Sequence, residues 1–142
     1  VYKRQIPNRL KPLEARAQRA GAEVILTNAN SLERERYGLV FADVPCSGSG
    51  TWRRDPTGKW RLQADELKEL IATQYSILTK AEHYLRCGGL LVYATCSVLK
   101  RENSNQIKRF MRENPQWRVI EERQSYPSDQ GDGFYFCYLQ KL

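Results

Sequence analysis

Two cysteines each follow a hydrophobic segment, and a thiol in such a place can act as a nucleophile. Cys46 comes shortly after the segment 39–43, and Cys96 comes directly after the segment 90–95. A helix-length stretch separates them, so we expect the two segments to be parallel strands joined by a crossover. The carboxyl ends of such strands open on one side of a sheet, where α/β folds bind ligands. The two thiols are therefore predicted to share one site.

The environment of each cysteine decides between a reactive thiol and a structural one. A thiolate is favoured near cations and backbone N–H groups, and Lys100 and Arg101 follow Cys96 closely. Taken alone, Cys96 is explained as well by a small buried residue, because free cysteine is among the most buried residue types. A second thiol at the matching position of a neighbouring strand, with Asp43 beside it, favours an enzyme site made of two thiols.

The elements that must position these thiols alternate between helical and extended patterns. This alternation predicts an α/β domain with a mainly parallel sheet, and two strands late in the chain predict an antiparallel edge. Gly88 and Gly89 are expected to end the long central helix. The remaining predicted elements are helices over 8–20, 65–87 and 102–113, and strands over 24–27, 117–120 and 134–139.

The composition limits the setting and the partners of the chain. Its 142 residues include 23 Lys and Arg against 16 Asp and Glu, a net charge of +7. Such a balance favours an acidic partner, of which nucleic acid is the commonest, although a basic enzyme without a polyanion has the same charge. One histidine and no close ligand pair predict no metal site. The absence of span-length apolar stretches predicts no membrane partner, and the four scattered cysteines fit a reducing cytoplasm.

A basic and aromatic stretch, 52–61, follows the Cys46 turn. Its cations can neutralise phosphates, and its two tryptophans can stack on splayed bases, as in proteins that hold single-stranded RNA. The alternative is a solvated loop whose tryptophans, Trp60 in particular, pack inward. The cations beside the Cys96 turn are better placed for phosphate contact. The predicted RNA-binding residues are Arg53, Arg54, Lys59, Lys100 and Arg101.

Two motifs carry a resemblance to a known family. The segments Asp-Val-Pro-Cys-Ser-Gly-Ser-Gly-Thr at 43–51 and Tyr-Ala-Thr-Cys-Ser-Val at 93–98 resemble the two cysteine motifs of the Fmu/Sun-type, RsmB-like RNA (cytosine-5) methyltransferases. The paired motifs at this separation are specific, and the resemblance extends over nearly the whole chain from Asn8 onward. Further agreement comes from the segments 53–60, 102–104 and 132–136.

The resemblance implies a Rossmann-like fold that uses S-adenosylmethionine and acts on RNA, with ribosomal RNA as the expected substrate. It implies that Cys96 attacks C6 of cytosine, which activates C5 for methylation, and that Cys46 helps to resolve the covalent adduct. Asp43 corresponds to the family's acidic residue at the junction of cofactor and target base, whereas a turn residue that bonds backbone N–H groups is the other interpretation. Asn28 stands where the family usually has an acid that contacts the adenine edge.

Three interpretations of function remain open at this level. Besides RNA methylation, the motifs allow DNA cytosine methylation with Cys46 as the nucleophile, or a non-catalytic RNA-binding module on the same fold. No strand and Gly-rich turn precede the first predicted helix, although a nucleotide-type α/β fold normally begins with both. We therefore expect residues 1–142 to be part of a catalytic domain without its first strands and Gly-rich cofactor loop, inactive by itself.

Overall fold

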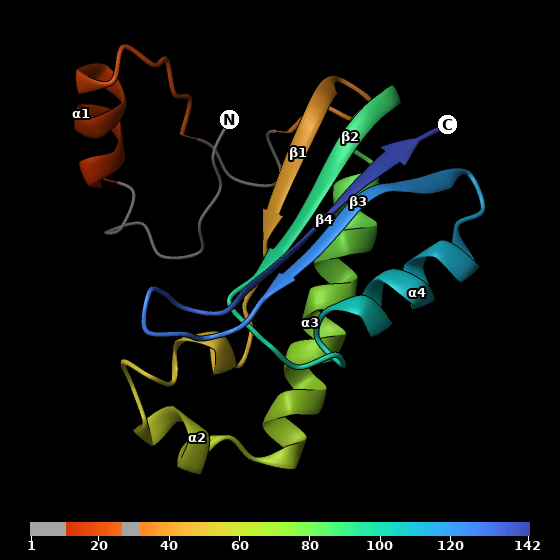
Figure 1. Cartoon of the computed structure of the whole chain (residues 1–142). Helices are drawn as coiled ribbons and strands as arrows, with labels where there is room; N and C mark the ends of the chain where they lie inside the picture. The colour runs from red at the N-terminus through yellow and green to blue at the C-terminus, as the bar shows by residue number, and fades with distance from the viewer. Residues whose placement is uncertain (1–10, 27–31) are drawn as a thin grey trace. The chain divides into compact units, whose positions relative to one another are not determined.

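A computed structural model describes residues 11–26 and 32–142 (Figure 1). The chain divides into two compact units, Val1–Glu33 and Arg34–Leu142. In the first unit, helix α1 spans Lys11–Arg19, and Gly21 follows it with a left-handed φ of 66°. Val24 and Ile25 form no strand, in contrast to the prediction for 24–27, and Thr27 lies outside the described residues.

The second unit contains a mixed four-stranded sheet in the order β1-β2-β4-β3. Strand β1 pairs with β2 in parallel, while β4 is antiparallel to both β2 and β3. The α/β class, the parallel pair that precedes the two cysteines and the antiparallel edge are thus as predicted. The sequence predicted a mainly parallel sheet, but only the pairing of β1 with β2 is parallel. The other two pairings are antiparallel, because the last two strands form a hairpin and β4 also pairs with β2. The elements are β1 (Tyr37–Asp43), the 3-10 helix η3 (Ser49–Thr51), α2 (Thr57–Arg61), α3 (Ala64–Glu82), β2 (Leu85–Thr95), α4 (Ser104–Glu113), β3 (Trp117–Ser125) and β4 (Phe134–Lys141).

The core of this unit lies between one face of the sheet and the helices α3 and α4. Side chains alternate between the two faces of a strand, and the inward positions on β2 and β4 are apolar. Helix α3 contributes Leu78 and Ala81, and helix α4 contributes Ile107 and Phe110. The core residues of β2 and β4 are Leu85, Leu91, Tyr93, Tyr135, Cys137 and Leu139, each at most 1 % exposed.

The long helix ends earlier than its glycine signal predicts. Helix α3 stops at Glu82, and Gly88 and Gly89 lie inside β2. Gly88 has a φ of 73°, and a Cβ atom on Gly89 would lie 2.8 Å from the carbonyl oxygen of Arg86. The pairing of β1 with β2 is irregular at this level of the sheet. The two glycines therefore serve a distortion of the strand, a role that glycine has in strand interiors as well as at helix ends.

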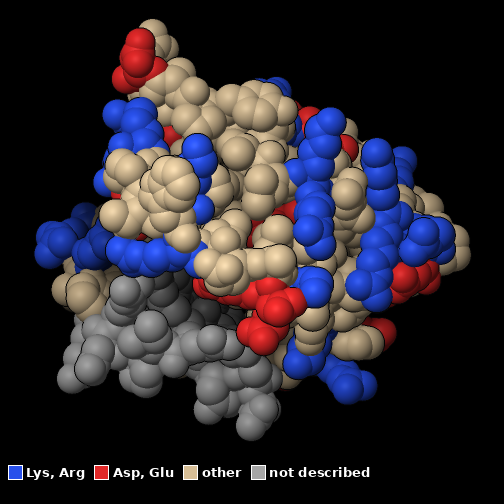
Figure 2. All heavy atoms as spheres, turned by 90° about the horizontal axis from the view of Figure 1, so that it is seen from below, with Lys and Arg blue, Asp and Glu red and all other residues tan. Residues whose placement is uncertain are grey.

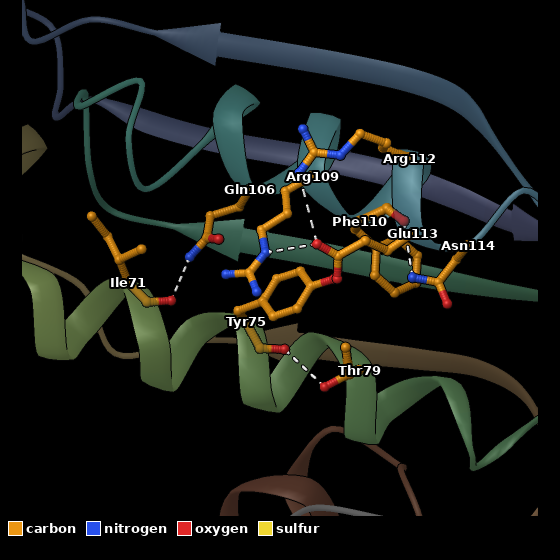
Figure 3. A network of polar contacts seen from close by, with 9 residues as sticks. All are labelled: Ile71, Tyr75, Thr79, Gln106, Arg109, Phe110, Arg112, Glu113 and Asn114. Atoms are coloured by element: carbon orange, nitrogen blue, oxygen red, sulfur yellow. Dashed lines mark hydrogen bonds and ion pairs between the residues drawn. The ribbon is translucent and has the colours of Figure 1, made fainter.

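Polar contacts fasten α4 to α3 along their exposed side (Figure 3). The guanidinium of Arg109 stacks on the ring of Tyr75, 3.7 Å from its centroid, and its Nε donates to Glu113 over 3.1 Å. The Tyr75 hydroxyl donates to the same carboxylate. One turn earlier, the amide of Gln106 donates to the carbonyl of Ile71 over 2.7 Å. These contacts fix the direction of α4 and of the turn that precedes it.

No helix in the described ranges 11–26 and 32–142 is both long and apolar enough to cross a lipid bilayer.

Candidate active site

The two cysteine turns leave the sheet side by side. Asp43, the last residue of β1, is paired with Ala94 of β2, and both strands end at the same edge of the sheet (Figure 1). Beyond this edge the Sγ atoms of Cys46 and Cys96 lie 3.3 Å apart, although 50 residues separate them in the chain. The predicted convergence of the two thiols is confirmed.

The two thiols are not equivalent. The hydrogen bond from Cys46 lowers the pKa of Cys96 to about 7, against the opposing effects of burial and of the negative charges of Asp43 and Glu102. The same hydrogen bond, together with burial, raises the pKa of Cys46 far above its ordinary value. With a pKa of about 7, Cys96 is a thiolate in about half of the molecules at neutral pH, while the proton of the pair stays on Cys46.

Backbone contacts hold three separate segments together around the thiols. The N–H of Gly50 donates to the carbonyl of Cys96 over 2.9 Å, and the N–H of Gly133 donates to the carbonyl of Gly50 over 2.8 Å. A Cβ atom on Gly50 would lie only 2.1 Å from the carbonyl oxygen of Gly133. Such close approach of backbone to backbone requires glycine, because any side chain at position 50 would push the two turns apart.

A buried carboxylate beneath the turns was not anticipated as a site residue. Glu102 is fully buried, and Asn103, which follows it, is only 1 % exposed. Helix α4 begins at Ser104, later than the predicted start at 102, because the side chains of these two residues turn inward and bond to the turns and to neighbouring strands. In the sequence, Glu102 opens a predicted helix and belongs to the segment 102–104 that agrees with the family, but no local pattern indicates that its side chain is buried. One signal was available in the polar Gln74, which occupies a position of the apolar stripe of α3 and is itself fully buried.

The two residues predicted to hold the cofactor have different outcomes. Asp43 lies at the carboxyl end of β1 with an exposed side chain, near enough to Cys96 to influence the charge of its thiol. Within the described part of the chain no hydrogen bond or ion pair engages its carboxylate, so it is available to a cationic or amino group. Asn28 lies outside the described residues.

The basic stretch after the Cys46 turn is partly neutralised and partly open. Arg53 and Arg54 reach the carboxylate of Asp132 at 3.8 and 2.5 Å, yet their side chains remain 49 % and 64 % exposed. Lys59 lies 5.6 Å from the ring centroid of Trp60, which is 80 % exposed. The alternative in which Trp60 packs inward is therefore wrong. An exposed indole beside exposed cations is suited to stacking on an unpaired base.

Lys100 and Arg101 are both exposed, but they border different hollows of the surface. Lys100 lines a pocket of about 290 Å³ together with Tyr126, and Arg101 lines one of about 230 Å³ together with Arg109. Figure 2, which looks at the molecule from below, shows Lys and Arg side chains spread widely over this face with acidic atoms between them. On the face shown, the cations are interspersed with acidic side chains and do not form a single patch.

Across residues 11–26 and 32–142, the His, Cys, Asp and Glu side chains form no group of three or more that could hold a metal ion.

The fold is that of a Rossmann-like methyltransferase. The structure matches a crystal structure of PH0851 with a TM-score of 0.85 and 26 % identity, over 96 % of this chain and 35 % of that one. It also matches NSun6 from Pyrococcus horikoshii, crystallised with SFG, with a TM-score of 0.77 and 23 % identity, over 96 % of this chain and 40 % of that one.

The chain belongs to the RsmB/F family of 16S rRNA methyltransferases, whose sequence pattern matches residues 4–140. It is 36 % identical to the Ribosomal RNA small subunit methyltransferase B of Vibrio cholerae serotype O1, over 94 % of this chain and 34 % of that protein. The chain thus spans about a third of the length of this curated relative. This family match confirms the resemblance that the two cysteine motifs indicated.

Proposed function

We propose that this chain is part of an S-adenosylmethionine-dependent enzyme that methylates C5 of cytosine in small-subunit ribosomal RNA. The contact between the Cys46 and Cys96 sulfurs is the observation that carries the proposal. Methylation at C5 needs a nucleophile on C6 and then a base at C5, and a thiol pair that shares one proton can supply both. The names of the family and of its curated relatives support ribosomal RNA as the substrate.

In the first step the Cys96 thiolate adds to C6 of the target cytosine. The new bond joins Sγ to C6, and the electron pair of the C5–C6 double bond becomes available at C5. The lowered pKa of Cys96 supports this assignment, because the thiolate is the reactive form at neutral pH. The alternative in which Cys46 attacks would need the shared proton of the pair on Cys96 instead, and covalent trapping with the two alanine variants distinguishes the two assignments.

In the release step Cys46 takes the proton from C5. Once the Cys96 sulfur is bonded to carbon, it carries no negative charge and is only a weak hydrogen-bond acceptor, so the main cause of the raised pKa of Cys46 is removed. Cys46 can then lose its own proton to solvent water, and the resulting thiolate accepts the C5 proton. The electron pair of that C–H bond restores the C5–C6 double bond, and Cys96 leaves as a thiolate.

S-adenosylmethionine, when bound, supplies the methyl group that C5 receives. The exposed carboxylate of Asp43, with no ion pair among the described residues, suits the ammonium group of this molecule or the amino edge of cytosine. A structural relative crystallised with SFG, an analogue of S-adenosylmethionine, is compatible with this choice.

We further propose that residues 1–142 are only part of the catalytic domain and that the Gly-rich cofactor loop belongs to sequence outside them. The 142 residues should accordingly bind S-adenosylmethionine weakly and show no methylation. Isothermal titration calorimetry tests this expectation, and micromolar affinity of the isolated chain would contradict it.

The function itself is tested with the intact gene product and labelled S-adenosylmethionine. The expected result is 5-methylcytosine in small-subunit ribosomal RNA, identified by nucleoside mass spectrometry, and none in a DNA of the same sequence. Methylation of the DNA alone would favour the DNA enzyme. RNA binding that survives in Cys96→Ala with an unchanged biological effect would favour a non-catalytic module.

A further inference from the structure

The carboxylate of Glu102 is surrounded by hydrogen-bond donors although it is fully buried. The backbone N–H and the hydroxyl of Ser47 donate to it over 2.8 and 2.6 Å. The hydroxyl of Ser97 donates over 2.5 Å, and the amide of Gln74 donates over 2.9 Å. Four donors therefore converge on one side chain, which leaves neither of its oxygens unsatisfied.

The two serines are the residues that directly follow the two cysteines. Ser47 belongs to the turn of Cys46, and Ser97 belongs to the turn of Cys96. One carboxylate thus bridges both turns from below, immediately beside the thiols. A bridge of this kind fixes the separation of the turns, which backbone pairing within the sheet cannot do beyond the strand ends.

The environment of Glu102 is unusual for a stabilising charge. No Lys or Arg of the described residues pairs with it, and burial of a carboxylate without a cation is costly. Its negative charge also opposes the thiolate form of Cys96. A residue that acted only through its charge would therefore hinder the proposed nucleophile, so the value of Glu102 must lie in the geometry that its bonds impose.

Gln74 extends the same arrangement into helix α3. Its amide also donates to the carbonyl of Pro45, the residue before Cys46, over 2.9 Å. Its own oxygen accepts a hydrogen bond from Gln106 of α4 over 3.0 Å, which fixes the orientation of the amide. The Cys46 turn is consequently held on both sides of its thiol, by Glu102 after it and by Gln74 before it.

We propose that Glu102 is a positioning residue that holds the Cys46 and Cys96 turns together, so that the two sulfurs stay in contact. This inference rests on the proposed function only for its consequence in catalysis. The contact between the thiols can be measured without RNA, which separates the two claims.

The test compares Glu102→Gln, Ser47→Ala and Ser97→Ala with the unchanged protein, each in the intact gene product. Phe110→Leu is the control, because Phe110 is a fully buried core residue of α4, the helix that follows Glu102. Three properties are measured for each: the pH profile of Cys96 alkylation, the glutathione equilibrium of a Cys46–Cys96 disulfide, and the rate of covalent trapping on RNA containing 5-fluorocytosine. Thermal unfolding shows which variants are folded at the temperature used.

Glu102→Gln removes a charge that opposes the Cys96 thiolate, but the hydrogen bond from Cys46 has the larger effect on the pKa of Cys96. Loss of that hydrogen bond is therefore expected to dominate, moving the alkylation profile toward higher pH and weakening the Cys46–Cys96 disulfide. Loss of the alignment between the two sulfurs should also slow covalent trapping by about a hundredfold, with little change in RNA affinity. The serine variants should change the alkylation profile, the disulfide equilibrium and the trapping rate in the same directions but by smaller amounts. Phe110→Leu should change only the unfolding temperature. If Glu102→Gln does not fold, the serine variants carry the test.

Variants that unfold earlier but keep the alkylation profile and the disulfide equilibrium would overturn the inference, since Glu102 would then serve the fold alone. Failure of the unchanged protein to trap RNA would overturn the proposed function and leave the thiol measurements to decide the inference.

Discussion

The thiol of Cys46 lies 3.3 Å from the sulfur of Cys96, and the hydrogen bond between them makes one thiol acidic at the expense of the other. The reactivity of the Cys96 thiol thus depends on Cys46 as well as on its own position. This relationship has consequences for reactivity that do not depend on the identity of the RNA.

Alkylation of Cys96 by iodoacetamide should reach half of its maximal rate near pH 7, because the pKa of Cys96 is lowered to about 7. Below this pH the thiolate is protonated and the rate falls; above it the rate reaches a plateau. In Cys46→Ala the hydrogen bond is lost, the pKa of Cys96 returns toward its ordinary value, and the rate at pH 7 should fall about tenfold. Cys87→Ala serves as the control. A profile of the unchanged protein centred near pH 9 would refute this account of the pair.

Mild oxidation by peroxide should join Cys46 to Cys96. The sulfurs need to approach from 3.3 Å to about 2 Å, and a thiolate with a neighbouring thiol oxidises readily to a disulfide. Cys137 should stay unmodified, because burial raises its pKa to about 12. Peptide mapping by mass spectrometry identifies the linked pair. Exclusive oxidation of the exposed Cys87, with both site thiols unchanged, would speak against the contact.

Gly50→Ala should destabilise the protein, whereas Gly131→Ala should not. A Cβ atom at position 50 would lie 2.1 Å from the carbonyl oxygen of Gly133, while at position 131 it would meet no atom within 4 Å. Forced separation of two backbone segments in a packed region costs about 1–3 kcal/mol. Urea unfolding of both variants measures the difference. Equal midpoints for the two would show that the Gly50 turn is not held as tightly as described.

Trp60→Ala should weaken RNA binding without loss of stability. The indole of Trp60 is 80 % exposed beside Lys59, so its removal leaves no cavity, while one stacked base contributes about 1–3 kcal/mol. Fluorescence anisotropy with single-stranded RNA should show an affinity reduced by about tenfold. Trp117→Ala is the contrasting variant, since Trp117 is 2 % exposed and its loss should lower stability first. Unchanged affinity in Trp60→Ala would remove this residue from the RNA-binding surface.

Lys100→Ala should reduce the dependence of RNA affinity on salt. Each cation that contacts a phosphate contributes about one unit to the slope of log affinity against log salt concentration. Lys100 is exposed and borders a pocket beside the Cys96 turn. Titrations at several salt concentrations measure the slope. An unaltered slope would show that Lys100 does not contact a phosphate.

The proximity of the two thiols could be predicted from the sequence because it follows from a local pattern. Two apolar strands separated by a helix imply a parallel pair, and residues at matching ends of such a pair must come close. The exposed Trp60 was harder to predict, because an aromatic residue in an irregular stretch has no periodicity that shows which way it faces.

Long-range contacts explain what the sequence could not show. Glu102 follows two basic residues, and nothing local indicates that its carboxylate receives donors from residues 47, 74 and 97. Gly88 and Gly89 carried a helix-end signal, but the pairing of β2 with β1 places them in a strand. In both cases the local structure depends on contacts with residues distant in the chain, and the neighbouring sequence contains no pattern that indicates those contacts.

Covalent trapping on RNA that contains 5-fluorocytosine tests the central claim most directly, because fluorine at C5 prevents proton removal and preserves the adduct. With S-adenosylmethionine present, the intact gene product and its Cys46→Ala variant should each give a band of protein joined to RNA on a denaturing gel, with slower formation in Cys46→Ala at neutral pH. Cys96→Ala should give none. An adduct that persists in Cys96→Ala and disappears in Cys46→Ala would contradict the assignment of Cys96 as the nucleophile.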